Sequence, residues 1–367
     1  MTEEKKLKIL LVLGIGIFAV IIYLLIFAFN IEVDKPKDKV GFIITGDVNK
    51  KGWSESSYRG IKKACEDLKL ELLVRDNIPE KSGKCYPVAE ELISEGANVI
   101  VLMSFNYVTE VRPLMDRYSN VSFISTSSLE KAKNLTSCFA RMYQGRYLAG
   151  ALAGMKTKTN VIGFVAAMPN SQVCRGINAF ALGVQRVNPD AKVLVMWTGA
   201  WQDEETEMKN AETLIKDYDA DVLTYHQNEE AVGKVAEKFG VDFIAYNALL
   251  DGYSEHYLAS AICHWDLFFK DILKRHLKGE LFSISNRWVG AQQGAINLAN
   301  YSSAVTPEMQ NILSSMRDEL AYDNNLIFYN EIYDNQGNLR CGKNQVLSDK
   351  ELLEHMDWLV RGVEVVE

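Results

Sequence analysis

The chain has 367 residues, of which 48% are hydrophobic and 24% charged, so its composition is that of an ordinary globular protein and not of a disordered or collagen-like chain. Its 48 acidic residues outnumber its 40 basic ones, which gives a net charge of −8. Because no overall basic field is available to hold phosphate backbones, nucleic-acid binding is not expected as the main function.

The first predicted element is a membrane-spanning helix. Residues 9–29 contain no charged side chain, and a helix of this length reaches across a hydrocarbon core of about 30 Å. A cleavable signal peptide has a shorter apolar region, and Ala28-Phe29-Asn30 is a poor cleavage site. Lysines flank both sides and leave the orientation open, whereas a cationic tail before an apolar run resembles an export signal. We therefore expect residues 1–37 to form an uncleaved anchor and linker in the cell membrane, with the large domain outside the cytoplasm.

Beyond the linker, short apolar runs alternate with amphipathic helical stretches. Most runs are continuous, which is typical of a parallel sheet covered by helices on both faces. In the first helix, Ile61, Ala64, Cys65 and Leu68 have the spacing of one helical face. The predicted strands are residues 40–44, 71–75, 99–103, 121–125, 161–166, 192–197, 222–225 and 242–246, and the later helices are residues 86–95, 145–156, 175–186, 204–218 and 229–239. The pattern predicts an α/β fold of βαβ units.

The length after the linker exceeds the usual limit of one core, about 250–300 residues, and therefore predicts two lobes. The first lobe is expected to comprise residues 38–140 plus 262–287, and the second residues 141–261 plus 288–367. The strand-like run 258–263 and the helix 265–277 are expected to return to the first lobe. The cleft between the lobes is then the expected ligand site.

Aromatic and amide side chains follow the carboxyl ends of the predicted strands, where open parallel sheets bind ligands. Aromatic faces stack on flat ligands, and amides and carboxylates bond to ring donors and acceptors, so a nucleobase or nucleoside fits this set. Each of these residues taken alone could equally be an ordinary loop residue, so the prediction of a ligand site rests on the cluster as a whole. The predicted ligand-binding residues are Asp47, Trp53, Ser54, Ser104, Phe105, Asn106, Met168, Trp201, His226, Gln227, Asn247 and Trp265.

Catalytic and metal motifs are not found in the sequence. It contains no GxSxG elbow, HExxH, Walker loop or GxGxxG after the first strand. His226 is the best general-base candidate, but no nucleophile lies at a recognisable spacing, so we do not expect an enzyme. The six cysteines form no CxxC pair, so no metal or cofactor is expected. Whether the cysteines are buried free thiols or form disulfides is left open by the sequence.

Several stretches resemble the basic membrane protein family, the substrate-binding proteins of the purine nucleoside receptor and Med type. The most specific are residues 161–201 and 219–247, and GWSESSYRG at 52–60 and CHWDLFFKDILK at 263–274 agree in order and spacing. The resemblance runs over about residues 39–281. It implies a type I periplasmic-binding fold, with two doubly wound parallel-sheet lobes joined by a hinge. Such a protein closes on a purine base or nucleoside and delivers it to an ABC permease.

The resemblance also assigns roles to single residues. Trp53 stands where the family carries the aromatic ring that stacks on the base, and Ser54 where many members have asparagine. Asn247 replaces an aspartate of the nucleoside receptors, and His264-Trp265 replaces a lysine region. These departures place the chain nearer the Med-like branch. The expected function is therefore a membrane-anchored binding protein for a purine base or nucleoside that serves an ABC importer. The alternative is a Med-like surface regulator or sensor without a transport role.

Overall fold

The computed structural model describes residues 38–250, 254–280 and 287–367, together with residues 3, 5, 14–18 and 20–22. The predicted membrane-spanning segment, residues 9–29, therefore lies mostly outside the described residues. Among the residues that are described, no helix combines the length and apolar character needed to cross a bilayer. The chain divides into two compact units, Met1–Asp38 and Lys39–Glu367, and the second contains the two lobes described below.

The first lobe is built on a six-stranded sheet with the order β11-β5-β4-β3-β1-β2, in which every neighbouring pair is parallel. Side chains alternate between its faces: Val40 and Phe42 pack with helices α2 and α9, whereas Ile43 packs with α3 and α4. Helices thus cover both faces, as the continuous apolar runs predict. The strands are β1 (Lys39–Ile43), β2 (Glu71–Arg75), β3 (Val99–Leu102), β4 (Ser122–Ser125), β5 (Leu135–Ala140) and β11 (Arg287–Val289), and the helices are α2 (Trp53–Leu68), α3 (Cys85–Ser94), α4 (Tyr107–Arg117) and α9 (Trp265–Leu277).

The second lobe is built on a seven-stranded sheet with the order β12-β10-β9-β8-β6-β7-β15. Only the β10–β12 pair is antiparallel. Its strands are β6 (Val161–Ala166), β7 (Lys192–Trp197), β8 (Val222–His226), β9 (Asp242–Tyr246), β10 (Tyr257–Cys263), β12 (Ile296–Ala299) and β15 (Val363–Val365). Its helices are α5 (Met142–Lys156), α6 (Ser171–Val187), α7 (Glu204–Lys216), α8 (Ala231–Phe239), α10 (Pro307–Tyr322) and α11 (Asp349–Glu354).

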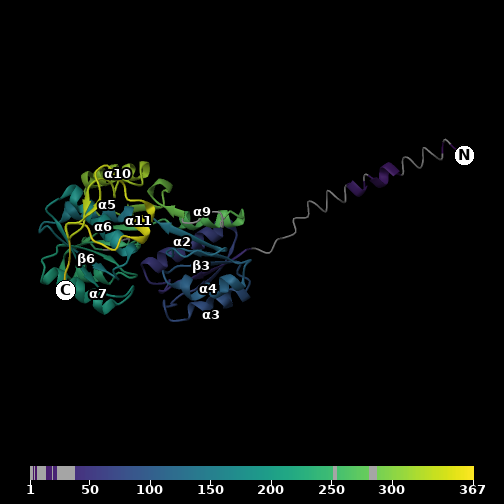
Figure 1. Cartoon of the computed structure of the whole chain (residues 1–367), viewed down its shortest axis with the longest axis horizontal. Helices are drawn as coiled ribbons and strands as arrows, with labels where there is room; N and C mark the ends of the chain where they lie inside the picture. Colours follow the sequence, from purple (N-terminus) through teal and green to yellow (C-terminus); the bar gives the residue numbers. More distant parts are fainter. Residues whose placement is uncertain are drawn as a thin grey trace. The chain divides into compact units, whose positions relative to one another are not determined.

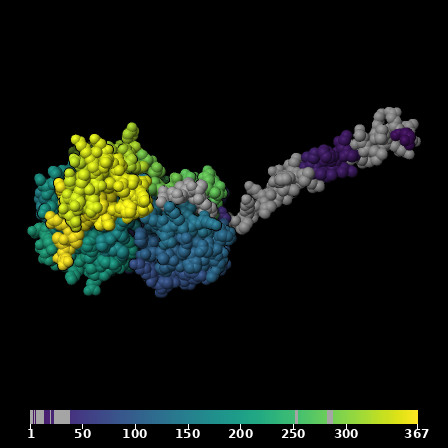
Figure 2. All heavy atoms as spheres, in the orientation of Figure 1, coloured from purple at the N-terminus to yellow at the C-terminus, as the bar shows by residue number. Residues whose placement is uncertain are grey.

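The C-terminal part of the chain completes the second lobe. Leu313, Phe328 and Met356 are buried in the same core as the central strands of that lobe, and the C-terminal residues cover part of the lobe in Figure 2. The short hairpin of β13 (Ile332–Tyr333) and β14 (Leu339–Cys341) belongs to this region, and the 3₁₀ turn η2 (Ala291–Gln293) leads from β11 to β12.

The chain passes between the lobes three times, from β5 to α5, from β10 to α9 and from β11 to β12. Figure 1 shows α9 beside α2, far from it in sequence, in the half that carries β3 and α4. The expectation that the strand-like run 258–263 returns to the first lobe is wrong, because β10 pairs with β9 and β12 in the second sheet. Every residue of β10 is buried, so the strand needs a neighbouring strand on each edge. Only the helix that follows it, α9, lies in the first lobe. Residues 288–289, expected in the second lobe, belong to β11 of the first sheet.

All six cysteines are free and buried, which answers the question left open by their number. Each thiol therefore packs as a small apolar side chain.

Glu207 on α7 carries a buried carboxyl group that links stability to pH. Its Oε1 accepts the backbone N–H of Asp203 at 3.0 Å, its Oε2 has no partner among the described residues, and burial raises its pKa to about 7. Because the folded pKa lies above the ordinary value of 4.5, the folded state retains a proton that the unfolded chain has released. The stability contributed by protonated Glu207 is therefore full below about pH 4.5 and is lost as the pH rises through about 7.

We expect Glu207→Gln to stabilise the protein at about pH 8 by roughly 1–3 kcal/mol and to give no gain at about pH 5. Glutamine keeps an acceptor for Asp203 but never ionises. Thermal unfolding followed by circular dichroism at both pH values measures this difference, with Glu205→Gln, an exposed position on the same helix, as the control. Equal effects of the two substitutions at every pH would contradict the prediction.

Candidate functional site

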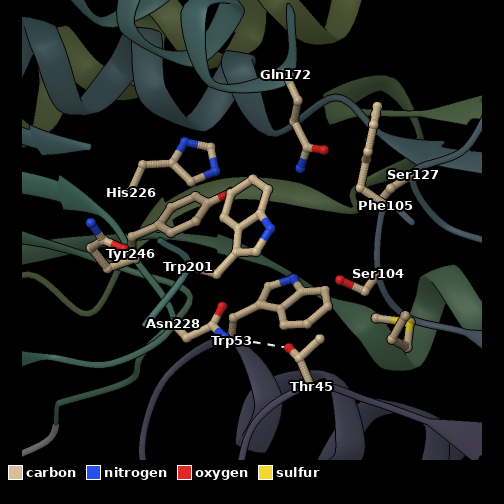
Figure 3. Close-up of a pocket in the computed structure, with 12 residues that line it drawn as sticks. Thr45, Trp53, Ser104, Phe105, Ser127, Gln172, Trp201, His226, Asn228 and Tyr246 are labelled. Carbon is tan, nitrogen blue, oxygen red and sulfur yellow. Dashed lines mark hydrogen bonds between the residues drawn. The ribbon is translucent and has the colours of Figure 1, made fainter. Parts of the chain in front are cut away.

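A cavity lies where the carboxyl-end loops of the two sheets meet (Figure 3). It contains about 430 Å³ of space, its opening to solvent included, a size typical of small-molecule sites. Both lobes contribute to the wall, which is formed by Thr45, Trp53, Met103, Ser104, Phe105, Ser127, Gln172, Trp201, His226, Gln227, Asn228 and Tyr246.

Aromatic rings from both lobes form much of the wall. Trp53 is the first residue of α2 and belongs to the first lobe, whereas Trp201 follows β7 in the second. Figure 3 shows both indoles and the Phe105 ring directed toward the same space. His226 lies 6.1 Å from Trp201 and 4.6 Å from Tyr246 between ring centroids. The cavity thus offers flat apolar faces to a planar ligand.

Polar groups at the edges of these rings give the wall its hydrogen-bonding capacity. Ser104 provides a hydroxyl group, and Gln172, Gln227 and Asn228 provide amides. Gln172 is positioned by the start of α6, where the Asn170 side chain accepts the backbone N–H groups of residues 172 and 173, both at 3.0 Å. Amide donors and acceptors around aromatic faces suit a heterocycle with ring nitrogens and carbonyls.

Glu80 organises the first-lobe side of the cavity, and it is not among the residues predicted from the sequence. Its carboxylate accepts hydrogen bonds from the Ser104 hydroxyl at 2.5 Å and from both the backbone and the side-chain amide of Asn106 at 2.8 Å. It also accepts the indole N–H of Trp201 from the other lobe at 3.3 Å. The loop after β2 contains Glu80 and lies at the same sheet edge as the other loops, so the strand-end rule applied to this loop would have found it.

Direct contacts join the two lobes beside the cavity. The backbone N–H of Trp53 donates to the carbonyl of Asn228 at 3.2 Å, and the Asn228 amide donates to the Thr45 hydroxyl at 3.4 Å (Figure 3). Lys50 and Glu229 form an ion pair at 3.1 Å farther out. The lobes are therefore in contact around the cavity, as in a closed form.

His226 faces the cavity as a neutral imidazole. It is almost completely buried, and burial together with the nearby positive charges of Arg146 and Arg175 holds its pKa well below the usual value. A neutral ring offers one donor and one acceptor nitrogen, which suits contact with a ligand.

The cavity continues into a second part that contains about 560 Å³, its opening included. Arg146 of α5 and Arg175 of α6 line this part, and neither is among the residues predicted from the sequence. The two parts share Trp53, Ser127, Gln172, His226 and Tyr246. Among the described residues, no group of three or more His, Cys, Asp or Glu is placed to hold a metal ion.

The structure brings together part of the predicted ligand-binding set. Trp53, Ser104, Phe105, Trp201, His226 and Gln227 line the first part of the cavity, and Trp265 lines the second. Asp47, Ser54, Asn106, Met168 and Asn247 line neither part.

Local geometry explains why some predicted residues are turned away. The Asp47 carboxylate accepts the backbone N–H of Asn49 at 2.8 Å and shapes its own turn, and the Asn106 amide is bound to Glu80. Asn247 is completely buried with φ 54°, one residue beyond Tyr246, and Tyr246 faces the cavity instead. Neighbouring residues at a strand end point in opposite directions, so the choice between them depends on where the strand stops.

Comparison with known proteins identifies relatives over most of the chain. The sequence profile of the Bmp family, described as ABC transporter substrate-binding protein PnrA-like, matches residues 37–333. A purine-binding protein of Brucella abortus is 29% identical over 272 residues, which cover 73% of this chain and 77% of that protein. A protein of Haloferax volcanii, named for glucose binding in an ABC transporter, is 30% identical over 278 residues, 76% of this chain and 68% of its own length.

Solved structures share the fold. The crystal structure of a transcriptional activator of the comK gene from Bacillus halodurans superimposes with a TM-score of 0.67 at 22% identity, covering 78% of this chain and 98% of that one. An ABC transporter solute-binding protein from Conexibacter woesei gives 0.63 at 16% identity, covering 78% and 97%. These similarities show a periplasmic-binding-protein fold of type I, and the match to the family profile confirms the resemblance found in the sequence. The chain belongs to the Bmp family of PnrA-like ABC transporter substrate-binding proteins.

Proposed function

We propose that this protein is an extracytoplasmic solute-binding protein, held at the membrane by its N-terminal segment, that captures a purine base or nucleoside for an ABC importer. The observation that carries the proposal is that Trp53 and Trp201, from different lobes, line one cavity with amide groups at its edges. The Brucella relative, named a purine-binding protein, supports the same ligand class. A membrane tether would raise the concentration of the loaded protein near a permease.

The mechanism follows from a ligand that touches both lobes. Its binding energy favours the closed form, because only in that form can both lobes contact the ligand at the same time. Trp53 supplies one stacking face, and Phe105 or Trp201 supplies a second. Asp47, Asn106 and Asn247, expected to direct the ligand, do not line the cavity, and the amide of Gln227 is bonded to Thr198, so we assign that role to Gln172 and Asn228.

Calorimetry with the full-length chain in detergent tests the ligand class. We expect adenine or guanosine to bind with a Kd in the micromolar range or tighter, that is, with a free energy of about −8 kcal/mol or more favourable, and we expect no binding of glucose. Glucose serves as the comparison because the Haloferax relative is named for it. Binding of glucose without binding of either purine would reject the proposed ligand.

A further inference from the structure

Two arginine side chains are buried in the wall of the second part of the cavity. Arg146 is 0% exposed, and its guanidinium donates to the Tyr225 carbonyl at 2.6 Å and the Thr224 hydroxyl at 3.3 Å. The same group lies 3.6 Å from the ring centroid of Tyr246. Arg175 is 6% exposed and donates to the Leu352 carbonyl at 2.6 Å. All of these partners are neutral.

In the part of the chain that the structure describes, neither arginine forms an ion pair with a carboxylate, although a buried cation normally has such a partner. Among the described residues, no Asp or Glu lines either part of the cavity; Glu354 and Asp357 line only an outer cleft beside Arg175. Arg141, by contrast, has the usual partner of a buried arginine, because its guanidinium forms an ion pair with Asp349 at 2.6 Å.

Both buried arginines keep their positive charge at neutral pH. Burial lowers the pKa of Arg146 and of Arg175 to about 10, so both stay protonated. The nearby His226 is neutral and adds no further positive charge. The wall therefore carries two buried positive charges that no described side chain lining the cavity neutralises.

The start of helix α6 adds to the positive field. Gln172, Arg175 and Gly176 from its first turns line the second part of the cavity, so the positive end of the helix dipole lies at the same wall. Guanidinium groups are also the side chains best shaped to bind carboxylate or phosphate oxygens in pairs.

We propose that the ligand is an anion: a planar heterocycle that lies against the indoles and directs a negatively charged group toward Arg146 and Arg175. The inference rests on the proposed function of this cavity and narrows its ligand class. Five residues are common to the two parts of the cavity, so one molecule can occupy both. The anion would supply the missing counter-charge, and its binding would offset the cost of burying the two cations.

Calorimetry with the full-length chain in detergent, using guanosine, guanosine monophosphate and urate, tests the inference. Guanosine is neutral, the monophosphate carries its charge on a phosphate, and urate carries it on the ring system. We expect at least one anion to bind at least about tenfold more tightly than guanosine. A preference for the monophosphate identifies a phosphate, and a preference for urate identifies an ionised ring; either supports the inference.

Variants connect the preference to the two arginines. Arg146→Gln and Arg175→Gln should each reduce the affinity for the preferred anion more than that for guanosine, so that the ratio falls toward one. Arg186→Gln is the matched control, since Arg186 lies on α6, the helix of Arg175, and pairs with Glu319 at the surface. This variant should still bind the anion more tightly than guanosine. If a buried arginine variant does not fold, the affinities of the three compounds for the unaltered chain still test whether the ligand is an anion.

Two outcomes separate this inference from the proposed function. Binding of guanosine with an affinity equal to or tighter than that of both anions would overturn the inference and leave the purine receptor intact. Failure of all three compounds to bind would overturn both.

Discussion

Replacing Trp53 by alanine is expected to raise the Kd for guanosine on the order of 100-fold. Its indole is half-buried and lies between the two parts of the cavity, where it can cover one face of a planar ring. Truncation of a central aromatic anchor commonly costs 2 kcal/mol or more, and each 1.4 kcal/mol corresponds to about a tenfold change in affinity. Calorimetry on the full-length chain measures the change.

Trp53→Phe is the matched control for this prediction. Phenylalanine keeps a flat ring at the start of α2 and should recover most of the lost affinity, because the indole N–H is not required for stacking. Circular dichroism should show similar unfolding temperatures for the unaltered chain and both variants, since the indole packs only at the edge of the first-lobe core. An unchanged Kd in Trp53→Ala would remove the stacking role and with it the main support for a purine-like ligand.

The sequence predicts the strands whose apolar runs are continuous and long. The predicted bounds 161–166 and 192–197 are those of β6 and β7, because every helix-covered parallel strand needs apolar side chains on both faces. β5, with the sequence LTSCFA, was not predicted, since Thr136 and Ser137 break its apolar run although both are buried. β15 contains Glu364 and pairs with β7, which is far away in the sequence, and no local pattern records such a pairing.

The candidate site is predictable only in part, for a related reason. The strand-end rule finds Trp53, Phe105 and His226 because loops after parallel strands gather at one edge. It does not find Arg146, which lies on α5, a helix buried on nearly all sides. An arginine in such a stretch resembles a solvent-facing residue until the neighbouring strands are placed around it. Arg146, which contributes to the charge of the cavity, is therefore hard to predict as a site residue from the sequence.

Gly52→Ala is expected to weaken guanosine binding by roughly 100-fold without unfolding either lobe. Gly52 has φ 142°, a region that side chains other than glycine rarely adopt, and a Cβ added to it would lie 2.0 Å from the Asn228 carbonyl oxygen of the other lobe. That oxygen accepts the Trp53 N–H at 3.2 Å, so an added methyl group pushes apart the two segments that meet in the closed form. The apparent affinity falls in proportion to the fraction of molecules able to close.

Gly83→Ala separates backbone strain from obstruction of closure. Gly83 also has a positive φ, 73°, but a Cβ there meets nothing within 4 Å, so its replacement adds strain alone. We expect Gly83→Ala to bind guanosine as the unaltered chain does. Small-angle scattering with saturating guanosine should show compaction of the unaltered chain and of Gly83→Ala, but not of Gly52→Ala. Compaction of both variants, with the same loss of affinity relative to the unaltered chain, would mean that backbone strain, and not contact between the lobes, limits binding.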